Sequence, residues 1–219
     1  MQEKQANFFK ERGVSIPEPQ TVFIDDAVRI GSGTTIMPFC VLRGFTTVGC
    51  NCFIDSFCQL NNAVVMDGAE IRSSRVTDST VGQNATVGPN AHLRQNSAVG
   101  DGCRIGNFVE LKNSVLGQGT KASHLAYVGD ATVGKNCNIG CGAVFVNYDG
   151  RVKHRTVVGD NAFIGSNCNL IAPLEIEGDC FIACGTTVTK NISKNDFVIG
   201  RSRETIKPDT ANRYLKERD

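Results

Sequence analysis

An apolar residue recurs at nearly every sixth position along most of the chain. The series runs from Ile24 to Val188, 21 of its 27 steps equal six residues, and 25 of its 28 members are Ile, Leu or Val. Neither an α-helix, with a period of 3.6 residues, nor independent strands, with a period of two, produce this regularity. Hexapeptide repeats are typical of a parallel β-helix, in which each recurring side chain forms one rung of a central stack.

The repeat is irregular in several places, including the five-residue steps from Leu111 to Leu116 and from Val128 to Val133. The rung assigned to Met66 is followed by three five-residue steps, and Ala122 takes a rung within a polar stretch. Thirteen residues, instead of six, separate the rungs Phe145 and Val158, which predicts a loop over 146–157. Functional residues are expected at such breaks, because local rules are violated there without structural need.

Small residues occupy two other positions of the repeat. Glycine often directly follows a rung, where we expect a corner that needs positive φ; examples are Gly31, Gly49, Gly88, Gly106, Gly140 and Gly165. The slot four residues after a rung contains seven cysteines, namely Cys40, Cys52, Cys58, Cys103, Cys137, Cys168 and Cys180. Free cysteine behaves as a small hydrophobe, so we expect these seven to fill the core.

The repeat divides the chain into three parts. We expect a short helix and a linker over 1–20, because Gly and Pro then interrupt the helical pattern. The β-helix covers 21–192 and includes the loop 146–157. The tail 193–219 is polar and ends in a predicted short helix over 208–218. The predicted fold class is therefore an all-β parallel β-helix with short helical or irregular extensions.

Composition limits the function. The 219 residues have a net charge of +1, so no broad electrostatic field favours nucleic acid or an anionic membrane. The start is charged rather than signal-like, and no stretch approaches the roughly 18 apolar residues of a membrane span. Ten cysteines without a CxxC pair give little support for disulfides or a structural zinc site. We expect a cytoplasmic protein with neither nucleic acid nor a membrane as partner.

Counting rungs predicts a stack of two cations. In a three-sided coil, rungs three apart lie on the same side, one strand spacing of about 4.8 Å from each other. Arg94 and Lys112 each directly follow such a rung. Two cations on successive coils indicate an anion site, with phosphate as the candidate. The alternative is two surface charges, each paired with a carboxylate such as Glu110.

The same count predicts a second stack, made of His124, Cys141, Ser166 and Cys184. Each of these residues follows its rung by two positions, and the rungs are again three apart. The column spans about 14 Å, which suits an extended thiol-bearing arm with its reactive end at His124. A lone histidine is more often structural, but the small residues above it and the Ala rung beneath it favour a functional role.

The stretches around these residues resemble a known family. They read ATVGPNAHLR, IGNFVELK, KASHLAYVGD, NIGCGAVFVNYDG, VVGDNAFIGSNCNLIAP and IACGTTVT. They are similar to the acetyltransferase half of the bifunctional UDP-N-acetylglucosamine pyrophosphorylase/glucosamine-1-phosphate N-acetyltransferase, weakly before about residue 80 and specifically over 86–201. The resemblance implies a left-handed β-helix that forms a homotrimer with active sites at chain boundaries. It also implies acetyl-CoA as co-substrate and no metal for acetyl transfer.

The resemblance implies a role for each candidate residue. His124 would be the general base that takes a proton from the amine of glucosamine-1-phosphate, because an ammonium group has no lone pair to attack a thioester. Arg94 and Lys112 would hold the sugar phosphate, and the sugar pocket would be completed by Glu110, Tyr127, Asn138 and Lys153. Acetyl-CoA would be contacted by Cys141, Asn147, Tyr148, Ser166, Cys184 and Arg201, of which Asn147 and Tyr148 would touch both substrates.

The sequence departs from the family pattern in two respects. The family usually carries Ala at the positions of Cys141 and Cys184, and a thiol there is open to oxidation or alkylation. The Gly-rich phosphate loop that opens the pyrophosphorylase half does not occur in this sequence. We therefore expect acetyl transfer without pyrophosphorylase activity.

Three other functions stay open. A zinc-dependent, carbonic-anhydrase-like trimer needs three converging histidines, whereas no two of His92, His124 and His154 share the predicted column. An acetyltransferase for another phosphorylated or nucleotide-linked amino sugar fits the pair of Arg94 and Lys112 equally well. A non-catalytic scaffold is disfavoured, because drift would have spoiled part of the intact residue set.

Overall fold

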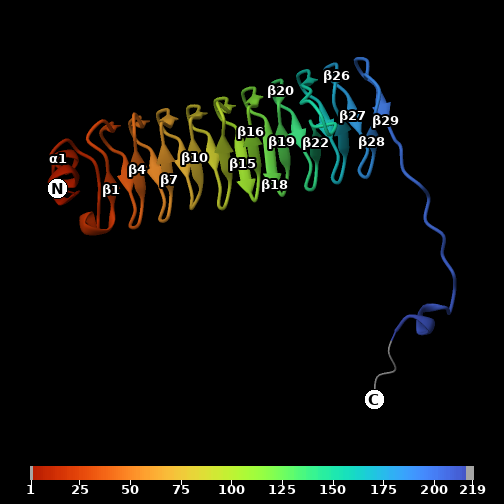
Figure 1. The fold of residues 1–219 in the computed structure, drawn as a ribbon, viewed down its shortest axis with the longest axis horizontal. Helices are drawn as coiled ribbons and strands as arrows, with labels where there is room; N and C mark the ends of the chain where they lie inside the picture. Colours follow the sequence, from red (N-terminus) through yellow and green to blue (C-terminus); the bar gives the residue numbers. More distant parts are fainter. Residues whose placement is uncertain (1, 216–219) are drawn as a thin grey trace.

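The computed structural model describes residues 2–215 and contains one long β-solenoid (Figure 1). Helix α1 (Gln2–Lys10) lies at the N-terminal end and is followed by the 3-10 turn η1 (Pro19–Thr21). The chain then winds through strands β1 to β29. Figure 1 shows that it leaves the solenoid after β29 as an extended tail, which contains the 3-10 turn η2 (Ala211–Arg213).

The strands form three parallel sheets, which we call faces I, II and III. Face I contains β1 (Phe23–Ile24), β4 (Val41–Arg43), β7 (Gln59–Asn61), β10 (Arg75–Thr77), β13 (His92–Arg94), β16 (Glu110–Lys112), β19 (Tyr127–Gly129), β22 (Val144–Val146), β25 (Asn169–Ile171) and β28 (Thr187–Val188). Face II contains β2 (Arg29–Ile30), β5 (Thr47–Val48), β8 (Val64–Val65), β11 (Thr80–Val81), β14 (Ala98–Val99), β17 (Val115–Leu116), β20 (Ala131–Val133), β23 (Thr156–Val158) and β26 (Leu174–Ile176).

Face III completes the prism. It contains β3 (Thr35–Ile36), β6 (Phe53–Ile54), β9 (Glu70–Ile71), β12 (Thr86–Val87), β15 (Arg104–Asn107), β18 (Lys121–His124), β21 (Asn138–Ile139), β24 (Phe163–Ile164), β27 (Phe181–Ile182) and β29 (Phe197–Val198). Neighbouring strands of one face belong to successive coils, so vertical neighbours are three rungs apart, as the sequence predicts. The prediction of an all-β parallel β-helix is therefore confirmed.

The rung side chains form the core. All the predicted rungs are buried except Ile30 and Met66. The assignment of Met66 is wrong, because its side chain is 42% exposed and Val65 is 2% exposed. Val65 is the residue in register with Val48 and Val81 on face II. The first five-residue step therefore comes before this rung rather than after it, and a β-branched residue takes the position inside the strand.

The cysteine slot is part of the core, as predicted. All seven cysteines of the slot are free and buried. Burial raises the pKa of the Cys103 and Cys137 thiols. These thiols therefore stay protonated at neutral pH and pack as small hydrophobes.

The reason expected for the glycines after the rungs is wrong in most cases. Of the six examples given, only Gly88 has a positive φ. The others are needed because successive coils approach closely. A Cβ on Gly140 would lie 2.5 Å from the backbone carbon of Gly165, and one on Gly106 would lie 1.9 Å from the Ser123 carbonyl oxygen. Positive φ falls later in the corners, often on Asn or Asp.

The N-terminal end of the core is covered. Helix α1 buries Ala6 and Phe9 against the first coil, so the open end of the stack is shielded from water. Solenoids need such caps, because a terminal coil has only one neighbour.

The C-terminal end differs from the expectation in two respects. Strand β29 pairs with β27 beyond the boundary predicted at residue 192. The helix predicted over 208–218 is replaced by the short turn η2, although 216–219 lie outside the described residues. Tyr214 and Leu215 are 83% and 68% exposed, so this segment has no core to pack on, and short isolated helices are marginal in water. No described helix is long and apolar enough to cross a membrane.

Candidate active site

The edge between faces III and I, called edge III–I, carries the predicted column. Strands β18, β21, β24 and β27 are consecutive neighbours on face III. Their rungs are in register as Ala122, Ile139, Ile164 and Ile182. The residues two positions later on each strand or corner are His124, Cys141, Ser166 and Cys184. The structure therefore aligns these four residues along one edge, as counting rungs predicts.

Backbone hydrogen bonds connect the successive corners of this edge. The Asn167 N–H donates to the Cys141 carbonyl and the Gly185 N–H to the Ser166 carbonyl, each at 2.8 Å. At the far end, Arg201 Nη1 donates to the Cys184 carbonyl at 2.9 Å. His124, Ser166 and Cys184 are exposed and Cys141 is half-buried, so the edge is open along its length.

His124 has a neighbour that sequence reasoning missed. It lies opposite Asn107 of the preceding coil, and both residues line a hollow of about 420 Å³. Within the described chain, Asn107 Oδ1 is buried and has no hydrogen-bond partner. The rung count contains the signal, because Asn107 follows the rung Ile105 by two residues and so extends the column downwards.

The two stacked cations lie on face I. Arg94 on β13 and Lys112 on β16 are direct register partners. The Arg94 guanidinium pairs with Glu110 at 2.7 Å, as the alternative interpretation predicts. Lys112 is only 5% exposed, and its ammonium contacts both carboxylate oxygens of Asp130 at 2.8 Å. Lys112 is therefore a buried ion-pair partner rather than a surface charge.

Asp130 is the centre of a polar network that the sequence analysis did not identify. Besides Lys112, the side-chain amides of Asn113 and Asn147 donate to its carboxylate, the former at 2.6 Å. Burial alone would raise the pKa of Asp130, but these hydrogen bonds and the Lys112 charge hold it below its ordinary value of 3.8. The ionised carboxylate thus fixes the start of the loop after β22 to face I.

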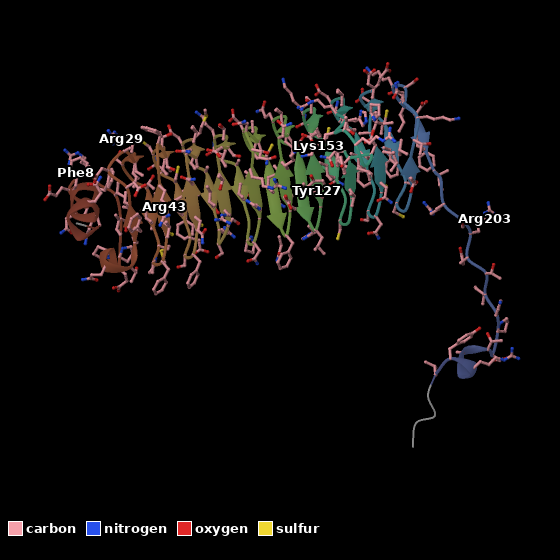
Figure 2. All side chains as sticks on the ribbon, viewed as in Figure 1. Phe8, Arg29, Arg43, Tyr127, Lys153 and Arg203 are labelled. Carbon is pink, nitrogen blue, oxygen red and sulfur yellow. The ribbon has the colours of Figure 1, made fainter. Side chains whose placement is uncertain are left out.

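The 146–157 loop folds back over this network. Asn147 is buried, and its amide also lies 3.5 Å from the hydroxyl of Tyr127, which it can reach as donor. Lys153 bridges to Tyr148 through the backbone, and the nearby Lys112 ammonium lowers the pKa of Lys153. Figure 2 shows Lys153 and Tyr127 in the same part of the solenoid. A third cation therefore joins Arg94 and Lys112.

The tip of the loop is held by its own hydrogen bonds. Asp149 accepts from the backbone N–H groups of Val152 and Arg151 and contacts the His154 ring at 2.7 Å. These contacts lower the pKa of Asp149 to about 2. Tyr148 is exposed, and its hydroxyl donates to the Gly150 carbonyl at 2.8 Å.

Asn138 lies apart from the other candidate sugar ligands. It is the first residue of β21 on face III and is in register with Lys121 and Phe163. Arg94 and Tyr127 belong to face I instead. Outward side chains on two faces of a prism diverge, so a single chain does not bring Asn138 to the cation cluster.

The three histidines are also dispersed. His92 lies on β13, His124 ends β18, and His154 lies in the 146–157 loop. Among residues 2–215, no group of three or more His, Cys, Asp or Glu side chains is arranged to hold a metal ion.

Comparison with known proteins gives a consistent result. Residues 20–101 and 75–145 match the family described as the GMPPB C-terminal domain, and 155–190 match the hexapeptide repeat of succinyl-transferase. The bifunctional protein GlmU of Clostridium novyi is 45% identical over 208 residues, which are 94% of this chain and 46% of that protein. GlmU of Clostridioides difficile is 48% identical over 195 residues, or 89% of this chain and 42% of that protein.

Solved structures show the same fold. LpxA from Bacteroides fragilis, a UDP-N-acetylglucosamine acyltransferase, has a TM-score of 0.65 at 18% identity, covering 83% of this chain and 70% of that one. The UDP-N-acetylglucosamine acyltransferase from Campylobacter jejuni has a TM-score of 0.60 at 15% identity, covering 84% and 70%. The fold is the left-handed parallel β-helix that the sequence resemblance implies.

These matches, together with the solenoid, define the protein as a left-handed β-helix of the hexapeptide-repeat class. Within that class, the chain belongs to the family of the C-terminal acetyltransferase domain of the bifunctional protein GlmU. The chain spans less than half the length of the two curated relatives, 46% and 42%.

Proposed function

We propose that the protein transfers the acetyl group of acetyl-CoA to the amine of glucosamine-1-phosphate and releases N-acetylglucosamine-1-phosphate and CoA. The observation that carries this proposal is the alignment of His124 with Cys141, Ser166 and Cys184 on one open edge. Family membership supports acetyl transfer, and the cation cluster on face I supports a phosphorylated acceptor.

His124 is the general base of the proposed reaction. Its imidazole takes a proton from the sugar amine as the nitrogen attacks the thioester carbonyl carbon, which gives a tetrahedral intermediate. The C–S bond then breaks, and the imidazolium returns the proton to the leaving thiolate. Ser166 or backbone N–H groups of the edge stabilise the oxyanion. His124 is exposed at the end of β18, where a substrate can reach it.

The acetyl-CoA arm lies along edge III–I in this proposal. The column of corners spans about 14 Å, long enough for an extended pantetheine. Cys141 and Cys184 flank the arm, and Arg201 is held at the far end through its bond to the Cys184 carbonyl. Asn147 and Tyr148 lie between β22 on face I and β23 on face II, so they would reach the arm from a neighbouring chain.

The sugar phosphate is bound by groups from two chains of a homotrimer. Arg94, Lys112 and Lys153 supply positive charge on face I, with Glu110 and Tyr127 beside them. Asn138 lies on face III, so a site that uses both faces requires a second chain. Closed cyclic symmetry repeats such a boundary site three times in a trimer.

One assay tests the reaction. The protein is incubated with acetyl-CoA and glucosamine-1-phosphate, and the acetylated sugar is detected by mass spectrometry, since ten cysteines would interfere with a thiol colour assay. We expect product with this acceptor and much less with unphosphorylated glucosamine. His124→Ala lowers kcat by about 10²–10⁴-fold, because a general base typically contributes that much.

A matched variant controls for surface changes. Lys135→Ala alters an exposed residue at the corner between faces II and III, away from edge III–I, and leaves turnover unchanged. Full activity in His124→Ala would remove the proposed base. Product formed only from another phosphorylated amino sugar would replace the acceptor and retain acetyl transfer.

A further inference from the structure

A second hollow, separate from the one at His124, lies on face I. It is on the N-terminal side of the cation cluster, which consists of Arg94, Lys112 and Lys153. It has a volume of about 520 Å³ and extends over β4, β7, β10 and β13. Its lining includes Arg43, Arg75 and Arg94, with the polar side chains of Gln59, Asn61 and Thr77 between them. Asp78 also lines the hollow, and its carboxylate accepts a hydrogen bond from the Asn62 amide at 3.0 Å. We call it the arginine groove; Figure 2 shows that Arg43 lies toward the N-terminal end of the solenoid from Tyr127.

Two of the three arginines lack an acidic partner. Arg94 pairs with Glu110, but the described residues include no carboxylate in ion-pair contact with Arg43 or Arg75. Arg43 instead lies over the ring of Phe23, at 5.3 Å from its centroid. Both guanidinium groups therefore keep most of their donors free, and a guanidinium is the side chain best suited to bind phosphate in a bidentate way.

The groove repeats part of the neighbouring site in sequence and in register. Residues 38–43 read PFCVLR and 89–94 read PNAHLR, and the two hexapeptides share Pro, Leu and Arg at the same positions. The ladder from Arg43 through Asn61 and Thr77 leads to the position of Arg94. Arg43 and Arg94 thus belong to the same column of face I, and their backbone positions are three strand spacings, or about 14 Å, apart.

Arg75 completes the arrangement from the adjacent column. It is in register with Gln59 below and His92 above, so it lies between the coils of Arg43 and Arg94. A single phosphate does not reach guanidinium groups distributed over about 14 Å, whereas two linked phosphates contact neighbouring pairs of them. The bounded volume and the net charge of +1 favour a small ligand over a nucleic acid.

We propose that the arginine groove binds a diphosphate group, with Arg43 and Arg75 as its principal ligands and Arg94 at its upper end. The ligand is inorganic pyrophosphate or the diphosphate of a nucleotide. Binding does not require the acetyl transfer proposed above. One consequence does rest on that function: a bound diphosphate engages Arg94, which then holds the sugar phosphate less well.

Calorimetric titration of the full chain with inorganic pyrophosphate tests the groove. We expect saturable binding that Arg43→Gln and Arg75→Gln each weaken by about tenfold or more, since each removes charge-assisted hydrogen bonds. Two controls remove one positive charge elsewhere: Arg203→Gln in the tail, and Lys153→Gln in the cation cluster. Both controls bind pyrophosphate within about twofold of wild type.

The outcomes separate the alternatives. Absence of saturable binding at millimolar pyrophosphate overturns the proposal. So does an equal loss in all four variants, which indicates general charge screening, or a loss in Lys153→Gln alone, which places the anion among Lys112 and Lys153. A parallel titration with ADP distinguishes the two sources: binding at least tenfold tighter than that of pyrophosphate assigns the groove to a nucleotide. A rise in the KM for glucosamine-1-phosphate when pyrophosphate is added would support the coupling through Arg94. An unchanged KM would overturn that coupling alone.

Discussion

A single buried carboxylate organises the charged part of face I. Asp130 compensates the buried ammonium of Lys112 and orders Asn147 at the start of the 146–157 loop. A buried charge without its partner is strongly destabilising, even where the intact pair contributes little net stability. The pair therefore holds the Lys112 ammonium in a fixed position beside Arg94, with its charge compensated by Asp130.

Removal of this carboxylate should be costly at neutral pH. We expect Asp130→Ala to lower the free energy of unfolding by about 3 kcal/mol, because Lys112 is left buried and unpaired. The folded-state pKa of Asp130 is depressed, so its contribution is present above 3.8 and is lost as pH falls through the lower folded value. Denaturant unfolding at fixed protein concentration, at several pH values, measures both effects.

The exposed Asp26 provides the comparison for this measurement. Asp26→Ala also removes an aspartate side chain, but Asp26 makes no ion pair among the described residues. We expect this variant to change the free energy of unfolding by no more than about 0.5 kcal/mol. A loss below about 1 kcal/mol in Asp130→Ala at pH 7 would contradict the role of the network.

A second residue-scale prediction concerns Asn107. Asn107 is the register partner of His124, and its buried Oδ1 has no partner among the described residues, so we expect it to accept the imidazole N–H and to fix the ring and its tautomer. Asn107→Ala should lower kcat by about tenfold and leave the KM for acetyl-CoA unchanged, as expected for a positioning residue. Asn107→Asp keeps an acceptor and restores most of the rate. If neither variant changes kcat, Asn107 does not position the base.

At the scale of elements, the register of the coils decides which side chains meet. The strands are mostly two or three residues long, so a rung is defined by its partners above and below rather than by strand length. A shift of one residue turns an inward side chain outward. This explains why both stacks of candidate residues follow from counting rungs, and why one miscounted rung changes only its own coil.

The corrected rung gives a direct test of the register. Val65→Ala should lower the free energy of unfolding by about 2 kcal/mol, since it removes buried methyl groups and leaves a cavity. Met66→Ala changes a side chain that is 42% exposed and should shift stability by less than about 0.5 kcal/mol. Thermal or denaturant unfolding of both variants measures the difference. The reverse order of the two effects would restore Met66 as the rung.

The sequence determines the fold almost completely, because period, rung identity and slot size all point to one architecture. It predicts the column from His124 to Cys184 and the alignment of Arg94 with Lys112 on successive coils, since both depend only on register. It misses Asp130 and Asn113, which lie in corners with positive φ. The repeat does not predict whether a side chain at such a corner points into the core or toward solvent. It also misses Asn107, because the predicted column begins at His124 and Asn107 lies one coil before it.

At the scale of the whole molecule, the three-sided solenoid separates the residues that are proposed to bind and activate the substrate. Asn138 lies on face III, His124 lies on edge III–I, and Arg94 with Lys112 lies on face I. A rigid, closely packed solenoid cannot fold these surfaces onto one another. The proposed cyclic trimer would resolve the separation, because each boundary would set one surface of a chain against a different surface of the next.

Mixed trimers test whether a site is shared between chains. His124→Ala and Arg94→Ala chains with different affinity tags are co-expressed, and particles that carry both tags are purified and checked for a mass of about three times 23.6 kDa. Each variant alone should be nearly inactive. If a site takes His124 from one chain and Arg94 from the next, every mixed trimer has one intact boundary, so roughly a third of wild-type turnover should return. A pair of tagged chains that both carry His124→Ala provides the inactive control. Mixed particles that remain as inactive as the control would mean that both residues act within a single chain, and the substrate would then have to bind around edge III–I.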